Sequence, residues 1–144
     1  MNVLKMNNQI YLSFHNKIFD NIIKNKRLEI LKIIKEELKR VQAFDCLDIG
    51  TTPDIKNESS NFIIKNLKLN LNYKAFSNFK IKDNFFSSST VGSIAEDLND
   101  KILNLLKSDI VLSSATIEHV GSNKNQNKII KNVASLTNKI FFIT

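Results

Sequence analysis

The sequence contains a single cysteine, which excludes an internal disulfide and suits a reducing compartment such as the cytoplasm. No apolar run is long enough for a membrane span, and the polar start Met1-Asn-Val-Leu-Lys5 is not a secretory signal. Two histidines and one cysteine without zinc-ligand spacing predict no metal site. The chain also lacks a Gly-x-Ser-x-Gly elbow and a phosphate-binding Gly-Lys-Ser/Thr loop. We therefore expect a cytoplasmic protein without a membrane span, a metal or those two catalytic loops.

The length and composition are those of one globular domain. The chain has 144 residues, 42% of them hydrophobic and 24% charged. The net charge of +7 raises the question of nucleic-acid binding. Nearly all the cations are lysines scattered among asparagines and isoleucines, and the nearest cluster, Lys24 to Arg27, falls on a helix whose other face is apolar. We interpret this cluster as a solvated face and expect no specific nucleic-acid partner.

The first third of the chain has the pattern of a long amphipathic helix. Residues 15–41 carry apolar side chains at spacings of three and four, and Asn25 is the point where the helix would break if it does. Such a helix either caps a substrate site or covers one face of a sheet. The apolar residues are Phe19, Ile22, Ile23, Ile30, Ile34, Leu38 and Val41.

Strands and helices alternate through the rest of the chain. Strands are expected at about 44–49, 72–77, 90–95, 110–113 and 139–144, and Cys46 is expected to be a small buried thiol within the first of them. Helices are expected around 62–67, 98–106 and 126–136, with Ser59 or Ser60 capping the first. This order predicts an α/β fold with a mostly parallel sheet flanked by helices.

Two motifs suggest a family. The segments Phe44-Asp-Cys-Leu-Asp-Ile-Gly-Thr-Thr-Pro-Asp54 and Ser108-Asp-Ile-Val-Leu-Ser-Ser-Ala-Thr-Ile-Glu-His-Val-Gly121 resemble the first- and fourth-strand motifs of class I S-adenosylmethionine-dependent methyltransferases. The resemblance implies a Rossmann-like fold over 44–144 and a helical segment over 1–43. It also implies two further strands, so we expect the amino-terminal part of a longer protein, inactive and prone to aggregate by itself.

The first motif and the residues after it imply a cofactor site. In the family this loop holds the amino-acid end of S-adenosylmethionine, which places Asp48, Gly50 and Thr52 at the cofactor. Thr52 and Asp54 stand where the family has its other two glycines. Asn61 either lies near the ligand or caps the next helix.

Later positions complete the expected site. Asn78 is the candidate for the ribose hydroxyls, and Asp97, after Glu96, either accepts from the adenine amino group or favours a helix dipole. Ser114 and Ala115 are small enough for a ligand to approach closely. Glu118 and His119 are expected at the substrate pocket, where His119 either acts as a general base or only shapes the pocket by hydrogen bonding.

The resemblance implies methyl transfer from S-adenosylmethionine to a small-molecule or lipid-like acceptor. An alternative is a non-catalytic binding or regulatory domain that kept the fold and lost the cofactor, which the reduced glycine loop would favour. A third hypothesis, a basic nucleic-acid-binding module, depends on charge alone. The sequence indicates neither the acceptor nor the oligomeric state.

Overall fold

The computed structural model describes residues 3–54, 60–114 and 116–144, with side chains described from Phe19 onward. The helices are α1 (Val3–Leu38), α2 (Phe62–Leu67), α3 (Asp100–Leu106), the short 3-10 helix η1 (Ile117–His119) and α4 (Asn123–Leu136). The strands are β1 (Asp45–Ile49), β2 (Asn72–Ser77), β3 (Ser88–Val91), β4 (Ser108–Ser113) and β5 (Thr137–Ile143).

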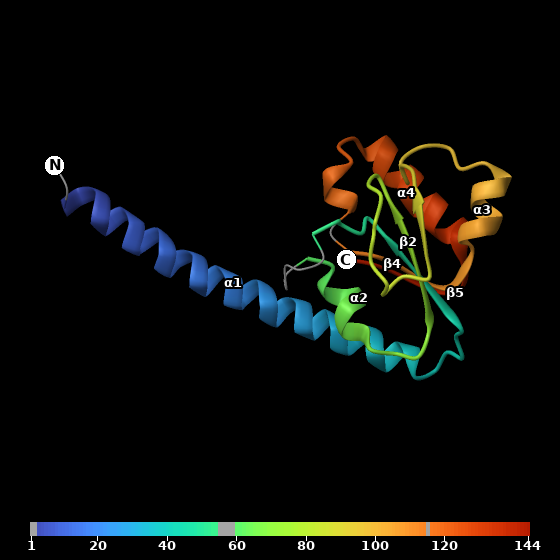
Figure 1. Cartoon of the computed structure of the whole chain (residues 1–144), viewed down its shortest axis with the longest axis horizontal. Helices are drawn as coiled ribbons and strands as arrows, with labels where there is room; N and C mark the ends of the chain where they lie inside the picture. Colours follow the sequence, from blue (N-terminus) through green and yellow to red (C-terminus); the bar gives the residue numbers. More distant parts are fainter. Residues whose placement is uncertain (1–2, 55–59, 115) are drawn as a thin grey trace.

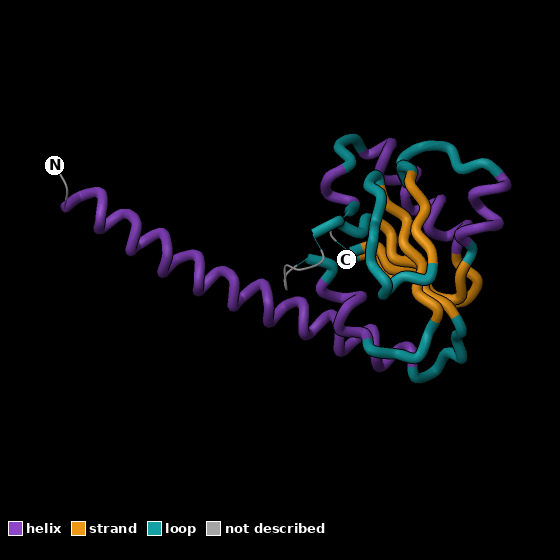
Figure 2. Tube along the Cα trace, viewed as in Figure 1, coloured by secondary structure: helices purple, strands orange, loops and turns teal. Residues whose placement is uncertain are grey.

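The strands form one fully parallel sheet in the order β3-β2-β1-β4-β5 (Figure 1). Helices cover both faces of this sheet (Figure 2). The arrangement is α/β and Rossmann-like, which confirms the predicted fold class.

Successive residues of the central strands point to opposite faces, so the sheet has two apolar layers. On one face Cys46 and Leu112 pack against α1 and α2, and on the other Leu47 and Val111 pack against α3 and α4. Cys46 is fully buried, as predicted, and burial raises the pKa of its thiol. Such a thiol is a packing group rather than a nucleophile.

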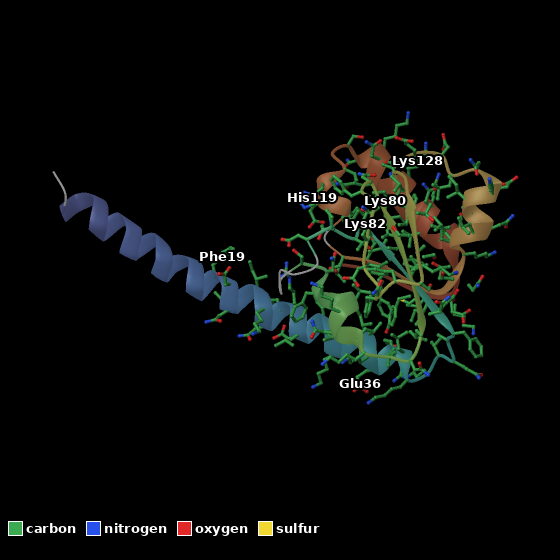
Figure 3. All side chains as sticks on the ribbon, viewed as in Figure 1. Phe19, Glu36, Lys80, Lys82, His119 and Lys128 are labelled. Carbon is green, nitrogen blue, oxygen red and sulfur yellow. The ribbon has the colours of Figure 1, made fainter. Side chains whose placement is uncertain are left out.

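Helix α1 is longer than the sequence predicted. It begins at Val3 and continues through Asn25 without a break. Only its last turns join the core, where Leu31, Ile34 and Leu38 are buried beside α2, so this part covers a sheet face. The amino-terminal part extends away from the domain (Figure 1), with Phe19 exposed on it (Figure 3). None of the helices in the described residues is long and apolar enough to cross a membrane.

Two local predictions were wrong. Asn61, and not Ser60, is the residue directly before α2. It has a left-handed conformation with φ of 55°, and its side chain makes no capping hydrogen bond. Ser59, the other predicted capping residue, lies outside the described residues. Strand β3 begins at Ser88 and ends at Val91, earlier than expected, because its four residues pair with β2 while the more apolar segment after it forms a loop.

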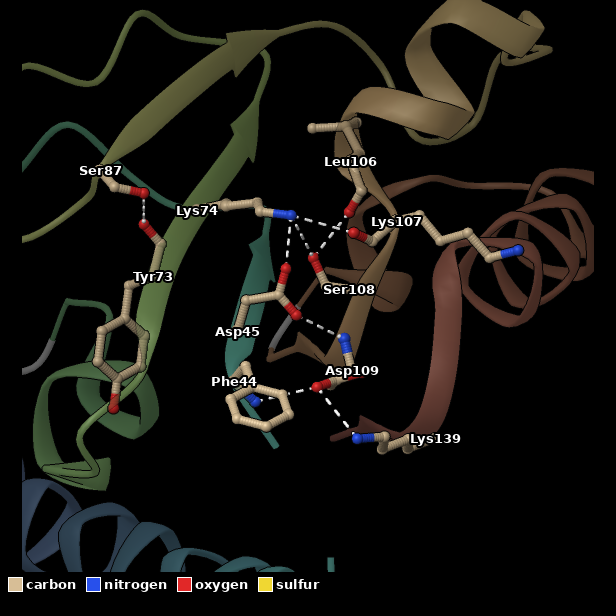
Figure 4. A network of polar contacts seen from close by, with 10 residues as sticks. All are labelled: Phe44, Asp45, Tyr73, Lys74, Ser87, Leu106, Lys107, Ser108, Asp109 and Lys139. Carbon is tan, nitrogen blue, oxygen red and sulfur yellow. Dashed lines mark hydrogen bonds and ion pairs between the residues drawn. The ribbon is translucent and has the colours of Figure 1, made fainter. Parts of the chain in front are cut away.

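A polar network joins the amino-terminal ends of the central strands (Figure 4). Asp45 accepts a hydrogen bond from the backbone N–H of Asp109 at 2.8 Å and pairs with Lys74 Nζ at 2.7 Å. Asp109 in turn accepts from the N–H of Phe44 at 2.9 Å and pairs with Lys139 at 3.3 Å. The N–H of Phe44 is the main cause of a lowered pKa at Asp109. These contacts fix β1, β2, β4 and β5 at the edge opposite the carboxyl ends.

Replacing Asp45 with alanine should therefore destabilise the domain. The change leaves the N–H of Asp109 without its side-chain acceptor and removes the carboxylate partner of Lys74 Nζ, which keeps only its hydrogen bonds to the Lys107 carbonyl and the Ser108 hydroxyl. We expect this to cost about 1–3 kcal/mol of unfolding free energy. Urea denaturation measures this loss. Glu29→Ala is the control, because it removes a solvated pair with Lys26 and should leave the midpoint unchanged. Equal midpoints for the two variants would show that the network has no stabilising role.

Candidate functional site

A cavity of about 430 Å³ lies at the carboxyl ends of the central strands. β1 lies between β2 and β4. From β1 the chain adds β2 and β3 on one side, and it then crosses to the other side of β1 to add β4 and β5. In open α/β sheets such a change of side opens the crevice in which ligands bind. The lining residues come from the carboxyl ends of β1 and β2 and the turns after them, from the segment after β4 that includes His119, from α1 and from the start of α2.

Gly50 forms the turn after β1. Its φ of +85° lies in the region that favours glycine, and its N–H donates to the carbonyl of Phe76 at 2.9 Å. A side chain here would meet Thr116, because an added Cβ would clash with Thr116 Oγ1. Thr116 Oγ1 donates to the carbonyl of Ile49 at 3.1 Å, so this threonine is held directly over the turn. The protein's own packing thus requires glycine at this position.

Thr52 and Asn61 form a latch across the cavity wall. The side-chain Oδ1 of Asn61 accepts from the N–H of Thr52, and its Nδ2 donates to the Thr52 carbonyl, both at 2.9 Å. Both polar groups of the Asn61 side chain are therefore hydrogen-bonded to the backbone of Thr52. The side chain of Asn61 makes no cap on α2, so the predicted capping role was wrong, and Asn61 lines the cavity.

Asp48 is a buried carboxyl at the base of the cavity. Only 5% of the residue is exposed, and its Oδ2 accepts from Thr51 Oγ1 at 2.5 Å. Burial raises its pKa to about 7, and the hydrogen bond from Thr51 lowers it by less. Near neutral pH this carboxyl is therefore present in both its neutral and its ionised form.

Ser77 and Asn78 end β2 at the same cavity. Ser77 is buried and its Oγ donates to the carbonyl of Thr51 at 2.6 Å, which ties the turn after β1 to β2. Asn78 is exposed and lines the cavity, so its amide can reach a ligand.

A smaller cavity of about 60 Å³ adjoins the first. Both cavities are lined by Gly50, Asn78 and Thr116, and the smaller one extends to Gly92 and Ile94 after β3. Asn132 of α4 holds this loop by donating to the carbonyls of Ile94 at 2.7 Å and Glu96 at 2.9 Å.

Three candidate residues stand apart from the cavities. Asp97 pairs with Lys128 Nζ at 2.6 Å and its side chain is 92% exposed, and neither it nor the exposed Asp54 is among the lining residues. Glu118 is exposed beside the cavity without lining it. Ala115 lies outside the described residues.

The segment after β4 closes one side of the cavity. Ser114 and His119 line it, and the side chain of His119 is largely exposed. Figure 3 shows His119 at the outer surface of the domain. His119 Nε2 lies 4.0 Å from Glu118 Oε1, which is at the limit of an ion pair. An imidazole exposed in this way is accessible from solvent, and among the described residues Glu118 is an acidic side chain near it.

Sequence reasoning missed Arg27, Thr51 and Thr116. Arg27 lines the cavity from α1, although its basic cluster was interpreted as a solvated face. The spacing of four between Arg27 and the buried Leu31 was the signal that could have found it. Thr51 and Thr116 act through single hydroxyl groups, for which a sequence offers no recognisable pattern.

The latch gives a prediction at Asn61. Asn61→Gly keeps a residue suited to positive φ but removes both hydrogen bonds to Thr52. We expect affinity for a ligand of the large cavity to fall about tenfold, because the wall loses its fixed shape, and we expect a smaller change in the melting temperature. Lys68→Gly is the control, since Lys68 also has positive φ, at 50°, but is not among the cavity-lining residues. Equal affinities of both variants for a ligand of this cavity would contradict a role for the latch in binding.

Comparison with known proteins does not identify a family for this chain. Neither a family model nor a curated protein matches this chain. A similar solved structure is that of a protein from Bacteroides thetaiotaomicron described as a "putative epimerase", with a TM-score of 0.48 and 15% sequence identity. The likeness covers 71% of this chain and 47% of that one, so the chain matches about half of that protein's length. A likeness this weak carries no argument about this chain.

Proposed function

We propose that this chain binds S-adenosylmethionine in the large cavity and belongs to a methyltransferase acting on a small-molecule or lipid-like acceptor. The observation that carries the proposal is a convergence. The two motifs that resemble the family, far apart in sequence, end at one cavity, which receives Asp48, Gly50 and Thr52 from one and Ser114 and His119 from the other.

The lining groups suit the chemistry of this cofactor. S-adenosylmethionine combines a carboxylate, an ammonium, a sulfonium, a ribose diol and an adenine ring. Asp48 offers a carboxyl that ionises more readily beside a cation. Asn78 offers both a donor and an acceptor to a diol. The smaller cavity beyond Thr116 extends the site past β3.

Methyl transfer from a sulfonium depends mainly on positioning. The cofactor would supply an activated methyl group, and this chain's residues would orient it. The Asn61 latch and the Ser77 hydroxyl fix the walls by hydrogen bonds to Thr52 and Thr51. His119, at the exposed rim, is placed to meet the acceptor, either to take a proton from it or to hold it by a hydrogen bond.

Titration calorimetry with S-adenosylmethionine, S-adenosylhomocysteine and NAD tests the proposal. We expect saturable heat with the first two ligands and none with NAD. A folded sample that gives heat only with NAD, or with none of the three at millimolar concentration, would contradict it.

One observation favours a second candidate, a Rossmann-like domain without a cofactor. Thr116 packs on Gly50, at the place where the protein backbone would approach a ligand. Thr52 and Asp54 stand where the family has its other two glycines. Retained folding with no binding of S-adenosylhomocysteine would select this candidate.

A further inference from the structure

Helix α1 carries an exposed stripe on a side that does not pack on the domain. Ile22, Lys26, Glu29 and Ile33 are all exposed, and their spacings of four, three and four place them on one side of the helix. The exposed fraction is 52% for Ile22 and 62% for Ile33, although both are large apolar residues. Glu36, three residues further on, lies on the side of α1 turned away from the domain (Figure 3). We call the first four residues the outer stripe.

The outer stripe has the spacing of a helix–helix contact. Ile22 and Glu29 are seven residues apart, and so are Lys26 and Ile33, which is the repeat of a coiled-coil seam. This part of α1 also extends beyond the sheet (Figure 1), and a helix without packing partners is only marginally stable in water. A second helix along the stripe would supply that packing.

The order of residues in the stripe is self-complementary. Four residues separate Ile22 from Lys26, and four separate Glu29 from Ile33. In an antiparallel pair of two copies, one register therefore sets Ile22 of each helix against Ile33 of the other and Lys26 of each against Glu29 of the other. A parallel pair would set lysine against lysine and glutamate against glutamate, which repel each other.

The charges of the stripe remain open to a second helix. Lys26 Nζ and Glu29 Oε2 form an ion pair at 2.8 Å within α1, but the two side chains are still 70% and 63% exposed. In the antiparallel register each charge keeps this neighbour and gains one of opposite sign from the other helix. A lysine inside a helix seam costs some stability and fixes the register of the pair.

We propose that the outer stripe of α1 binds the same stripe of a second copy of this chain, in an antiparallel helix pair with two-fold symmetry. The two domains lie outside the pair, because the buried residues of α1 are on another side of the helix. The contact does not depend on the proposed function. It is short, so we expect the protein to be monomeric at the low concentrations of urea denaturation, where Glu29→Ala remains a valid control.

Charge exchange tests the pairing, with sedimentation velocity of the whole chain as the measurement. Lys26→Glu and Glu29→Lys each set like charges against each other and should weaken dimerisation about tenfold or more. An equimolar mixture of the two variants should form dimers again, since each then meets the opposite charge. In that mixture neither chain has its internal ion pair, so recovery can only come from contacts between chains. The double variant should also recover.

A cysteine pair tests the register. With oxidised glutathione, a mixture of Ile22→Cys and Ile33→Cys should give a disulfide-linked dimer, whereas Ile22→Cys alone should not. The native Cys46 is fully buried and does not take part. Lys24→Glu is the control for charge, because it changes the net charge as Lys26→Glu does at an exposed position off the stripe, and it should dimerise like the wild type. Circular dichroism confirms that each variant is folded.

The proposal is overturned if the wild type stays monomeric at millimolar concentration, or if neither charge variant weakens the dimer. It is also overturned if Lys24→Glu causes the same loss, because the effect is then one of net charge, or if Ile22→Cys alone is cross-linked, because the pair is then parallel. A monomer that binds phosphatidylserine vesicles, and loses this binding in Ile33→Glu, would assign the stripe to a membrane surface instead.

Discussion

Gly50→Ala is expected to cause the largest loss of stability of any change at the site. A Cβ at φ of +85° is strained, and it would clash with Thr116 Oγ1. The strain costs about 1–2 kcal/mol and the overpacking about 1–3 kcal/mol, which is a large part of the stability of a typical domain. Relief of the clash would displace Thr116, and ligand binding should be lost with it. Urea denaturation and titration with S-adenosylhomocysteine measure the two effects.

Gly121→Ala provides a matched control. Gly121 has φ of +78°, but an added Cβ would meet no atom within 4 Å. This variant should show the backbone strain alone. In the double variant Gly50→Ala with Thr116→Ala, part of the lost stability should return, because the clashing hydroxyl is gone. Equal losses for Gly50→Ala and Gly121→Ala would contradict the role assigned to Thr116.

Asp48→Asn is expected to stabilise the protein at alkaline pH. Burial raises the pKa of Asp48 from 3.8 to about 7. Between these values the folded state holds a proton that the unfolded state has released, so this group's contribution to stability falls as pH rises from about 4 to about 7. Above pH 7 both states are ionised and the loss is complete. Over this range it amounts to about 4 kcal/mol, as an order of magnitude.

The difference between the wild type and Asp48→Asn isolates this effect. Asparagine keeps an acceptor for Thr51 Oγ1 and never ionises. The two proteins should have similar unfolding free energies at pH 4, and the variant should be the more stable at pH 8. A stability difference that does not vary with pH would show that Asp48 titrates normally. Ligand affinity should fall in the same variant if the carboxylate faces a cationic group.

The central strands could be predicted because their chemistry is local. Residues 45–49 and 108–113 are short apolar runs that end in a turn, and burial on both faces of a parallel sheet requires such runs. The bounds predicted for β3 were wrong because its polar residues have no strand pattern. It forms a strand through its pairing with β2. The helix does not break at Asn25, since one asparagine costs a helix less than a break would.

The candidate site likewise contains residues that the sequence could predict and residues that it could not. Asp48 and Gly50 were found because strand ends in an α/β fold lie at the ligand edge. The partners of Asp97 and Gly50 could not be found, because Lys128 and Thr116 are brought to them only by the packing of the fold. Arg27 was missed because it lies among lysines of the same helix whose pattern is that of a solvated face.

Amide hydrogen exchange in the presence and absence of S-adenosylhomocysteine tests the central claim most directly. If the ligand occupies the cavity at the ends of β1 and β4, peptides covering 48–54 and 114–120 should exchange more slowly when it is present, while the exposed residues of α1 before Arg27 and strand β5 should not change. Protection confined to those other segments, or no protection at a saturating ligand concentration, would contradict the account.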